Sequence, residues 1–225
     1  MNIILFGPPG AGKGTQAAKI VKKFNLYKVS TGDLLRDEIK NNTDLGIKIK
    51  SMMDKGNLIS DSVLNDLIVK VLSNKKLNNR LIFDGYPRNL EQAKNLDFQI
   101  KKNNQKISCV LSLDVDKESV TKRILGRQTC VNCGLIFNKY YNPATKINHP
   151  CDSKFLSKRS DDNEKTIVNR YETYLNKTLP IIDFYDKQNL LHQINGMLEI
   201  DQIFGEIRGI IASLETWLYN LYLYK

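Results

Sequence analysis

The chain has 225 residues, of which 41% are hydrophobic and 26% are charged, a composition typical of one globular domain. It contains no apolar run of the roughly 18 residues that a transmembrane helix needs. Its first residues lack the basic region and the cleavage site of a signal peptide. We therefore expect a cytoplasmic protein that makes no membrane contact and acts as a monomer.

The net charge and the cysteines indicate which kinds of ligand the protein could bind. The net charge of +10 suits nucleic acid, a membrane surface or small polyphosphate ligands, but composition alone favours a solvated basic surface. Four cysteines are too few for a disulfide scaffold. Three of them, Cys130, Cys133 and Cys151, fall in one loop-like region, which favours metal binding in a reducing compartment. Cys109 lies in an apolar run and is expected to be a buried hydrophobic residue.

Short apolar runs alternate along the chain with longer helical patterns. The runs predict strands at Asn2–Phe6, Lys28–Ser30, Arg80–Asp84, Ile107–Asp114 and Leu190–Asn195. The helical patterns between them cover Gly14–Phe24, Asp61–Ser73, Leu90–Asn103 and Lys117–Leu125. This alternation predicts an α/β fold with a doubly wound, five-stranded parallel sheet. Ligands of such sheets bind beyond the carboxyl ends of the strands.

Two stretches interrupt the alternation. Residues 30–59 are helical in pattern, with a turn at 55–57, whereas residues 126–160 contain Cys, Pro, Asn and Tyr and few helix formers. Long interruptions within a compact domain usually serve function. We interpret both as inserted subdomains of a single domain, 1–225. The core of that domain then consists of residues 1–29, 60–125 and 161–225.

The most specific motif follows the first predicted strand. Gly7-Pro-Pro-Gly-Ala-Gly-Lys-Gly-Thr15 leaves a buried strand and opens a helix. Its glycines allow backbone N–H groups to curl around an anion, and the helix N-terminus adds partial positive charge. Lys13 supplies a full charge that can follow a transferring phosphoryl group. The expected donor-phosphate residues are Gly10, Ala11, Gly12, Lys13, Gly14 and Thr15.

This phosphate loop departs from the general pattern in one position. Gly14 stands where Ser or Thr usually follows the lysine. The variant resembles the nucleoside monophosphate kinases, and over nearly the whole chain the sequence resembles adenylate kinases of the long-lid bacterial type. The resemblance implies a P-loop kinase fold with an AMP-binding insert (30–59) and a lid insert (126–160). It also implies the reaction Mg·ATP + AMP ⇌ 2 ADP, with Mg²⁺ as cofactor and without nucleic acid as partner.

The acceptor-side motif Ser30-Thr-Gly-Asp-Leu-Leu-Arg36 matches the start of the family's AMP-binding subdomain. The resemblance implies that Thr31 lies near the acceptor base and that Arg36 pairs with its phosphate, for which a planar guanidinium is well suited. Ser30 is also expected to cap a helix. The stretch expected to close over the base comprises Asn57, Leu58 and Ile59.

A second acceptor-side motif, Asp84-Gly-Tyr-Pro-Arg88, follows the third predicted strand. The resemblance implies that Arg88 grips the acceptor phosphate and that Gln92 reads the adenine edge. Asp84, at the carboxyl end of a strand, is expected to organise waters on Mg²⁺. The motif contributes Gly85, Tyr86, Pro87 and Arg88 to the AMP site.

The lid insert is flanked by arginines. Arg123-Ile-Leu-Gly-Arg127 resembles the point where the family's chain leaves the core for the lid, and Arg159 and Arg170 match its return. We expect the four guanidinium groups to converge on the bridging phosphates, where neutralising charge is the protein's main task. The expected catalytic residues are Lys13, Asp84, Arg88, Arg123, Arg127, Arg159 and Arg170. Of these, Arg127 is assigned to ATP, and Arg159 and Arg170 also to AMP.

Two further pairs near the lid have predicted roles. Asp161 and Asp162 are expected to hold the arginines or to act as hinge contacts. Ile136 and Phe137 fall where the family packs the lid over the donor base, although an Ile-Phe pair more often forms simply a small core.

The lid cysteines resemble the family's zinc-carrying lid. The resemblance implies a structural zinc ion held by Cys130, Cys133 and Cys151. Tetrahedral zinc takes a fourth ligand, but the family's position for it is occupied here by Lys154, a poor ligand while protonated. Asp152 and His149 are the nearby substitutes. A former zinc lid, held by apolar packing and hydrogen bonds, is the alternative.

Two other functions are compatible with parts of the sequence. A UMP/CMP kinase would share the fold. Thr31, Gln92 and the long lid argue against it, because in the pyrimidine enzymes we would expect an alanine near position 31 and a short lid. A zinc-ribbon nucleic-acid-binding protein would use the charge of +10. Its basic residues should form a continuous stripe with interleaved aromatics, whereas here they cluster in kinase motifs.

Overall fold

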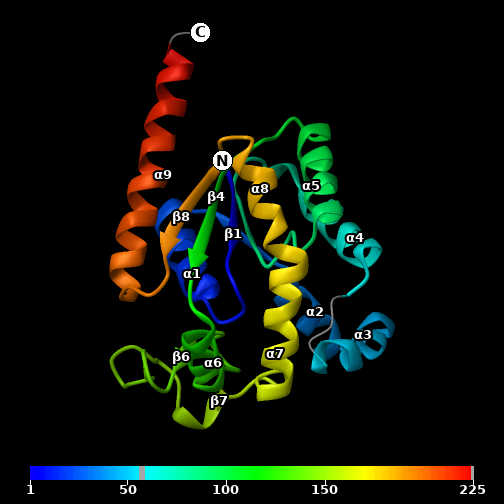
Figure 1. Cartoon of the computed structure of the whole chain (residues 1–225), viewed down its shortest axis with the longest axis vertical. Helices are drawn as coiled ribbons and strands as arrows, with labels where there is room; N and C mark the ends of the chain where they lie inside the picture. Colours follow the sequence, from blue (N-terminus) through cyan, green and yellow to red (C-terminus); the bar gives the residue numbers. More distant parts are fainter. Residues whose placement is uncertain (56–58, 224–225) are drawn as a thin grey trace.

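The computed structural model describes residues 1–55 and 59–223, with side-chain surroundings as far as residue 216. Figure 1 shows a central sheet with helices on either side and a smaller unit below it. The strands are β1 (Asn2–Phe6), β2 (Tyr27–Ser30), β3 (Leu81–Asp84), β4 (Ile107–Asp114), β5 (Arg127–Cys130), β6 (Ile136–Asn138), β7 (Leu156–Ser157) and β8 (Leu191–Asn195).

The helices fall between these strands. They are α1 (Lys13–Phe24), α2 (Thr31–Lys40), α3 (Asp44–Asp54), α4 (Asp61–Leu72), α5 (Leu90–Lys102), α6 (Lys117–Leu125), α7 (Glu164–Thr173), α8 (Pro180–Asp186) and α9 (Ile200–Leu223). Short turns of 3₁₀-helix lie at η1 (Lys75–Leu77) and η2 (Ser153–Phe155), and a π-helical segment, η3 (Tyr174–Thr178), joins α7 to α8. None of the described helices is long and apolar enough to cross a bilayer.

The main sheet has the strand order β2-β3-β1-β4-β8, and all of its neighbouring strands are parallel. The central strand β1 pairs Ile4 with Phe83 of β3 on one side and with Val110 of β4 on the other. This confirms the predicted five-stranded doubly wound sheet. Because β1 is central, its carboxyl end lies where the strand order diverges, which is where such sheets bind their ligands.

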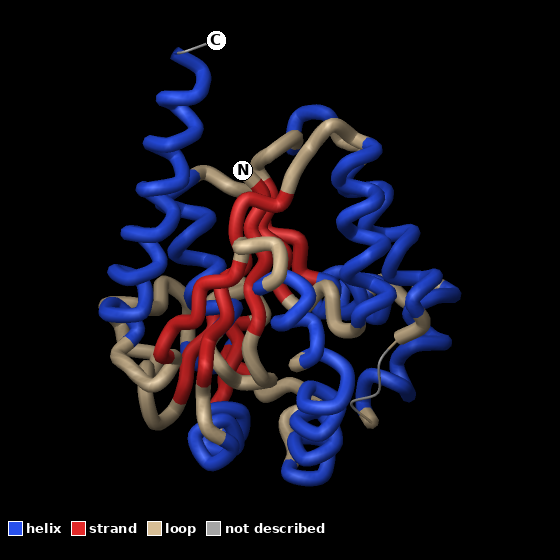
Figure 2. Tube along the Cα trace, turned by 45° about the horizontal axis from the view of Figure 1, so that its top comes forward, coloured by secondary structure: helices blue, strands red, loops and turns tan. Residues whose placement is uncertain are grey.

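The two faces of the sheet bury two separate hydrophobic clusters, since alternate residues of a strand point to opposite faces. Ile4 and Phe6 pack with α2, α4, α5 and α8, whereas Ile3 and Leu5 pack with α1, α6, α7 and α9. Figure 2 shows the sheet enclosed between these helices. Cys109 is fully buried in the second cluster, as expected for a hydrophobic strand residue.

The acceptor-side insert consists of two helices, α2 and α3, and not of one continuous helical run. The chain turns at Asn42, which has a left-handed φ of 51°, and Thr43 caps α3 by accepting a hydrogen bond from the Gly46 amide at 3.0 Å. A Cβ on Gly46 would lie 2.2 Å from the Glu38 carbonyl oxygen. Only glycine permits this close approach of α3 to α2.

The lid region contains a small antiparallel sheet of order β6-β5-β7. It forms the unit below the main sheet in Figure 1. Its buried side chains are Cys130, Phe137 and His149. In the described part of the chain, neither hydrophobic cluster of the main sheet includes a residue of 126–160.

Candidate nucleotide-binding site

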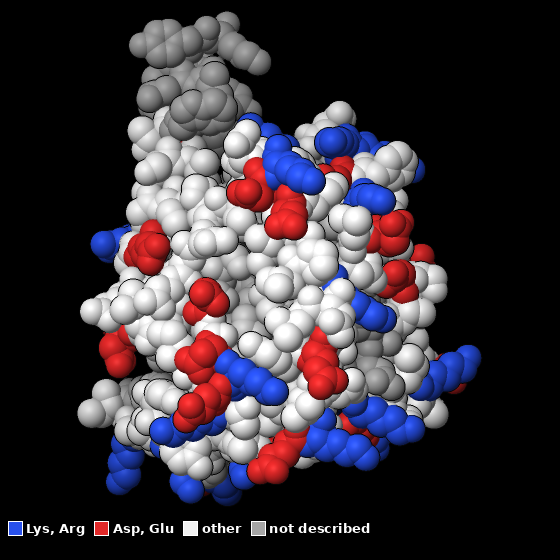
Figure 3. Space-filling view, in the orientation of Figure 1, with Lys and Arg blue, Asp and Glu red and all other residues white. Residues whose placement is uncertain are grey.

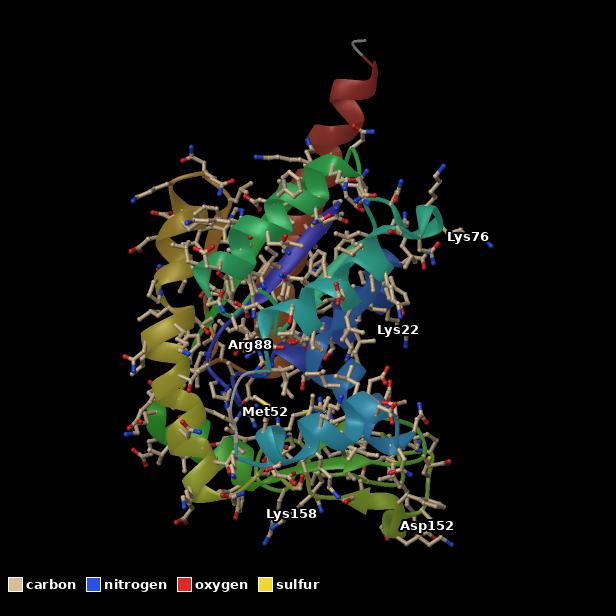
Figure 4. All side chains as sticks on the ribbon, turned by 90° about the vertical axis from the view of Figure 1, so that its right-hand side faces the viewer. Lys22, Met52, Lys76, Arg88, Asp152 and Lys158 are labelled. Carbon is tan, nitrogen blue, oxygen red and sulfur yellow. The ribbon has the colours of Figure 1, made fainter. Side chains whose placement is uncertain are left out.

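A cavity of about 330 Å³ lies beyond the carboxyl ends of β1 and β3. Its wall joins the phosphate loop, the starts of α2 and α6, the lid strand β6, helix α7 and the loop before α9. Figure 4 shows Arg88 in the interior of the view, whereas Lys22 and Lys76 lie at the periphery. The volume suits a small-molecule ligand.

Lys13 lies in the wall of this cavity and is held by the phosphate loop. Its Nζ donates to the carbonyl oxygens of Gly7 at 2.7 Å and Pro8 at 2.9 Å. Burial, followed by the charges of Arg88, Arg170 and Arg127, lowers the pKa of Lys13 to about 8, although Asp84 opposes this. Burial and neighbouring cations thus disfavour the charged form of Lys13, and a bound anion would stabilise that charged form.

The glycines of the loop meet two different requirements. Gly12, the residue before α1, has a φ of 92°, which side-chain-bearing residues rarely adopt. Gly10 has a φ of 82°, and a Cβ there would lie 2.7 Å from Cγ1 of Ile124. The loop can therefore curl and pack against α6 only with glycine at these positions. The other predicted loop residues, Ala11, Gly14 and Thr15, also line the cavity.

All six of the predicted arginines line the same cavity: Arg36, Arg88, Arg123, Arg127, Arg159 and Arg170. Burial, reinforced by neighbouring guanidinium groups, lowers the pKa of Arg88 and of Arg159 to about 10. Burial likewise lowers the pKa of Arg170. So many buried cations create a strongly positive field, which favours a polyanionic ligand.

Two aspartates order part of this cluster, as predicted. Asp162, with its side chain 1% exposed, pairs with the Nε and Nη2 groups of Arg127. Asp161 accepts a hydrogen bond from Nη1 of Arg170 at 2.7 Å. Burial opposes the charge on Arg127, but Asp162 outweighs it and raises the pKa of Arg127. These pairs fix the two guanidinium groups in the cavity wall.

The acceptor side carries its own charge pattern. Asp33 accepts from Nη2 of Arg36 at 2.5 Å and from Nζ of Lys28 at 2.7 Å. Burial opposes ionisation of Asp33, but these two partners outweigh it and hold its pKa below the usual range. Arg88 donates from Nε to the Gly85 carbonyl at 2.7 Å, and its own carbonyl accepts from Thr178 of η3 at 2.8 Å. Asp84, Gly85 and Pro87 complete this wall.

Other predicted acceptor residues lie behind the wall. Thr31 is buried and donates to the Gly85 carbonyl at 3.0 Å. The Gln92 side chain accepts from the Arg88 amide at 2.7 Å and donates to Asp61 at 2.6 Å. In this arrangement Gln92 supports Arg88 and does not line the cavity. Its predicted contact with the adenine edge would require it to leave Asp61.

Three further predictions concern residues around the AMP insert. Tyr86 is fully buried and donates from its hydroxyl to Asn65 at 2.9 Å. Ile59 is buried in the first hydrophobic cluster. Neither belongs to the cavity wall. Asn57 and Leu58 lie outside the described residues.

The lid strand β6 lies over the phosphate loop. A Cβ on Gly14 would lie 3.3 Å from Cδ1 of Ile136, so the two residues are in close contact. Ile136 and Phe137 both belong to the cavity wall. The Phe137 ring, however, is only 4% exposed and packs edge-on against His149 inside the lid, with ring centroids 4.9 Å apart. The observed packing is that of a small core within the lid, and the contact of Phe137 with a donor base stays a prediction.

The lid also brings four candidate metal ligands together. One ligand atom from each of Cys130, Cys133, His149 and Cys151 lies within 4.8 Å of the other three. The Nε2 atom of His149 is buried without a hydrogen-bond partner. Three sulfur ligands and one imidazole are a set that zinc takes in tetrahedral structural sites.

Asp152, the other substitute considered from the sequence, lies outside this set. Its carboxylate accepts from the Lys154 amide at 2.8 Å and so caps η2. Figure 4 shows Asp152 at the outer edge of the lid. Among the described residues, the structure therefore groups His149 and not Asp152 with the three cysteines.

Some cavity residues were not predicted as site residues. Tyr141 lies in the wall, with the Arg123 guanidinium 5.6 Å from its ring centroid. Residues Met197 to Ile200, in the loop after β8, also line the cavity. The general rule that ligands lie beyond strand ends points to this loop. Nothing in the residue types of 197–200 distinguishes it further.

Comparisons with known proteins agree with this geometry. The family model described as adenylate kinase matches residues 5–190. An adenylate kinase of Pelagibacter ubique is 48% identical over 211 residues, covering 94% of this chain and 99% of that protein. Adenylate kinases of Listeria innocua and Archaeoglobus fulgidus are each 40% identical, covering 95% and 96% of this chain and all of those proteins. The chain therefore belongs to the adenylate kinase family.

Proposed function

We propose that this protein transfers the terminal phosphoryl group of Mg·ATP to AMP, giving two molecules of ADP, and so balances the adenine nucleotides of the cell. The observation that carries the proposal is the convergence of Lys13 and the buried arginines on one cavity between a phosphate loop and an acceptor wall. Two nucleotides carrying several phosphates between them supply the negative charge that this cluster lacks.

On the donor side, the loop amides and Lys13 would hold the ATP phosphates. Ile136 and the loop before α9 would cover the nucleotide, since both lie in the cavity wall. Arg123 and Arg127 would neutralise charge on the bridging oxygens. Fixed cations stabilise the transition state of phosphoryl transfer without having to reorganise during the reaction.

On the acceptor side, Arg36 and Arg88 would bind the AMP phosphate, with Arg159 and Arg170 between the two substrates. Arg36 would exchange part of its contact with Asp33 for the phosphate. An attacking phosphate oxygen that is already an anion needs no general base. The residue set accordingly positions and neutralises the reacting groups.

Closure of two inserts, 30–59 and 126–160, over the core would exclude water from the reaction. One direct hydrogen bond already joins them, from the Ser160 hydroxyl to the Asp54 carboxylate at 2.7 Å. Excluding water protects the phosphoryl group from hydrolysis.

The residues beside the phosphate loop fit the magnesium ion that accompanies ATP. Asp84 lies at the carboxyl end of β3, with one carboxylate oxygen 3.7 Å from the position of a Cβ on Gly14. Oxygen ligands and retained waters are what Mg²⁺ prefers. We propose that Asp84 orients waters on the ion, which would neutralise phosphate charge when bound.

For the lid we propose a structural zinc ion held by Cys130, Cys133, His149 and Cys151. The closeness of the four ligand atoms and the unpaired His149 nitrogen support it. The Cys133 amide points at the Cys130 sulfur at 3.5 Å, a contact that favours the thiolate. The ion would hold the lid together and take no part in the chemistry.

We further propose that the protein acts as a monomer in the cytoplasm and without nucleic acid. All the charged groups of the cavity come from one chain. Figure 3 shows acidic side chains between the basic ones on the visible face. That pattern gives no support on this face to the continuous basic stripe expected of a nucleic-acid-binding protein.

The test is ADP formation from Mg·ATP with AMP, UMP, CMP and GMP assayed in parallel. We expect turnover with AMP far above that with the other acceptors. A preference for UMP or CMP would keep the fold and the phosphoryl transfer but overturn the assignment of the acceptor. No turnover with any of the four would refute the proposed activity.

A further inference from the structure

Two rings in edge-to-face contact connect the cluster of metal ligands in the lid to the wall of the nucleotide cavity. His149 is 6% exposed, although it lies in an otherwise exposed loop. One of its ring nitrogens belongs to the group of four ligand atoms. Its ring also packs on Phe137 in a T-shaped arrangement, at an interplanar angle of 64°.

Phe137 in turn fixes the strand that faces the phosphate loop. It is the middle residue of β6 and pairs with Gln128 of β5. Neighbouring side chains of a strand point to opposite faces. The Phe137 ring therefore points into the lid while Ile136 contacts Gly14 of the phosphate loop. A shift of the Phe137 ring would move the Ile136 contact with it.

We propose that His149 is a positioning residue for the donor side of the cavity. One nitrogen of its ring is the fourth metal ligand, and the ring packs against Phe137 and holds it in place. Metal binding to the set would thereby hold Ile136 over the phosphate loop. This inference rests on the proposed zinc set and on the proposed donor role of β6.

Substitutions at this single position separate the two functions of the side chain. His149→Cys keeps a metal ligand but removes the ring, whereas His149→Phe keeps a ring but removes the ligand. His149→Ala removes both. Asp152→Ala is the matched control, because Asp152 lies in the same loop, outside the ligand set.

The first readout is metal binding, which is monitored through the absorption spectrum of Co²⁺ bound in the lid. We expect the wild type, Asp152→Ala and His149→Cys to bind one ion, with a changed spectrum in His149→Cys as a nitrogen ligand gives way to sulfur. His149→Phe and His149→Ala should bind it at least about tenfold more weakly, as loss of supporting groups at metal sites already does. Unaltered Co²⁺ affinity and spectrum in His149→Phe would show that His149 is not a ligand.

The second readout is the Kd of a fluorescent ATP analogue, with the KM for AMP as the internal reference. Aromatic pairs contribute enough that losing one should weaken donor binding about 2- to 10-fold. We expect that loss in His149→Cys and His149→Ala, with the KM for AMP changed less than about twofold. Removing the metal from the wild type with a chelator should also weaken ATP binding.

The outcomes distinguish this inference from the functions on which it rests. One outcome would overturn the positioning role and leave the zinc site standing. In it, the Co²⁺ spectrum shows four protein ligands, but the Kd for the ATP analogue is unchanged both in His149→Cys and after chelation. A wild type that binds no metal would overturn the zinc site and the coupling together, while its kinase activity would still be measurable. Weakened AMP binding equal to the loss for ATP would indicate a general loss of structure and would also overturn the inference.

Discussion

The two inserts that flank the cavity are stabilised in different ways. The acceptor insert adds Leu35 and Ile49 to the hydrophobic cluster on one face of the main sheet. The lid, over its described residues, adds none to either cluster and buries only a few side chains of its own. One insert is thus an extension of the core, and the other is a separate small unit. A unit with so little apolar burial needs another source of stability, such as a bound metal.

This difference indicates that the two inserts move in different ways. An insert that shares the core can open only by disturbing that core, whereas a separately stabilised lid can move as a body on its two connections.

The largest expected effect comes from the acceptor insert. Ile49→Ala should lower the free energy of unfolding of the whole domain by about 2–5 kcal/mol, the usual cost of truncating a buried isoleucine. Ile47→Ala is the control, because Ile47 lies on the same helix but is 66% exposed. Urea denaturation measures both. A small effect of Ile49→Ala, equal to that of Ile47→Ala, would mean that the insert is as separate from the core as the lid is.

Lys13→Met should reduce turnover by on the order of 10²-fold or more, by analogy with the loss of a preorganised charge donor. Arg88→Ala should cost as much. Lys13→Met should not destabilise the fold, because it removes a buried charge that burial disfavours. Lys22→Met provides the same substitution on an exposed part of α1. Steady-state ADP formation is the measurement, and near-normal turnover in Lys13→Met would refute its role.

Removing a metal ligand should unfold the lid and leave the core folded. Cys130→Ser is expected to reduce zinc from about one ion per chain to near none, and to expose residues 126–160 to limited proteolysis while the core stays folded. Cys109→Ser is not a suitable control because Cys109 is buried in the core, so exposed Ser157→Ala serves instead. Cooperative loss of the whole domain in Cys130→Ser would erase the contrast between the inserts.

Lys13 should give opposite pH dependences for binding and for stability. Its pKa is about 8 in the folded protein, against an ordinary value of 10.5. Above pH 8 the unliganded protein loses this charge, so the affinity for ATP should fall by at most about tenfold per pH unit. Between pH 8 and 10.5 the unfolded chain binds the extra proton, so the contribution of Lys13 makes unfolding less favourable as pH rises. Titrating ATP binding and stability in parallel, with Lys13→Met as reference, checks both signs.

The smallest expected effect concerns the hydrogen bond between the inserts. Ser160→Ala removes the donor to Asp54, an exposed contact of about 0.5–1 kcal/mol, which corresponds to roughly 2- to 5-fold in the apparent affinity for substrates. Because both inserts lose it together, ATP and AMP should be affected alike. An effect on one substrate only would show that the inserts close independently.

Much of the core was predictable because its signals are local. The apolar run at Asn2–Phe6 and the glycine-rich loop after it fix a buried strand and an anion-binding turn, and Ile107–Asp114 was likewise predicted with its observed bounds. The residues assigned from motifs also came together. Lys13, Arg88, Arg127, Arg159 and Arg170 share one cavity, because the motifs follow strands whose carboxyl ends meet.

The remaining features depend on contacts between distant residues. The break between α2 and α3 has local signals in Asn42 and Thr43, which the helical pattern obscured. His149 was one of two substitutes named from the sequence, but only the folded lid distinguishes it from Asp152, by bringing its ring to Cys130 and Phe137. Gln92 was assigned to the base, yet its amide is engaged by Asp61, a partnership that no motif spacing reveals.

The last helix has a consequence for how the protein is made. Helix α9 packs Ile203, Ile207 and Ile211 against α1, and Gln16 of α1 donates to the Ile200 carbonyl at 2.9 Å. The ribosome synthesises the phosphate loop well before the helix α9 that packs on α1. Domains fold as units once the required chain has emerged. A nascent chain that already displays the acceptor motifs therefore still lacks the strand β8 and the helix that complete the donor side, so the capacity to bind both nucleotides arises only after α9 has been synthesised.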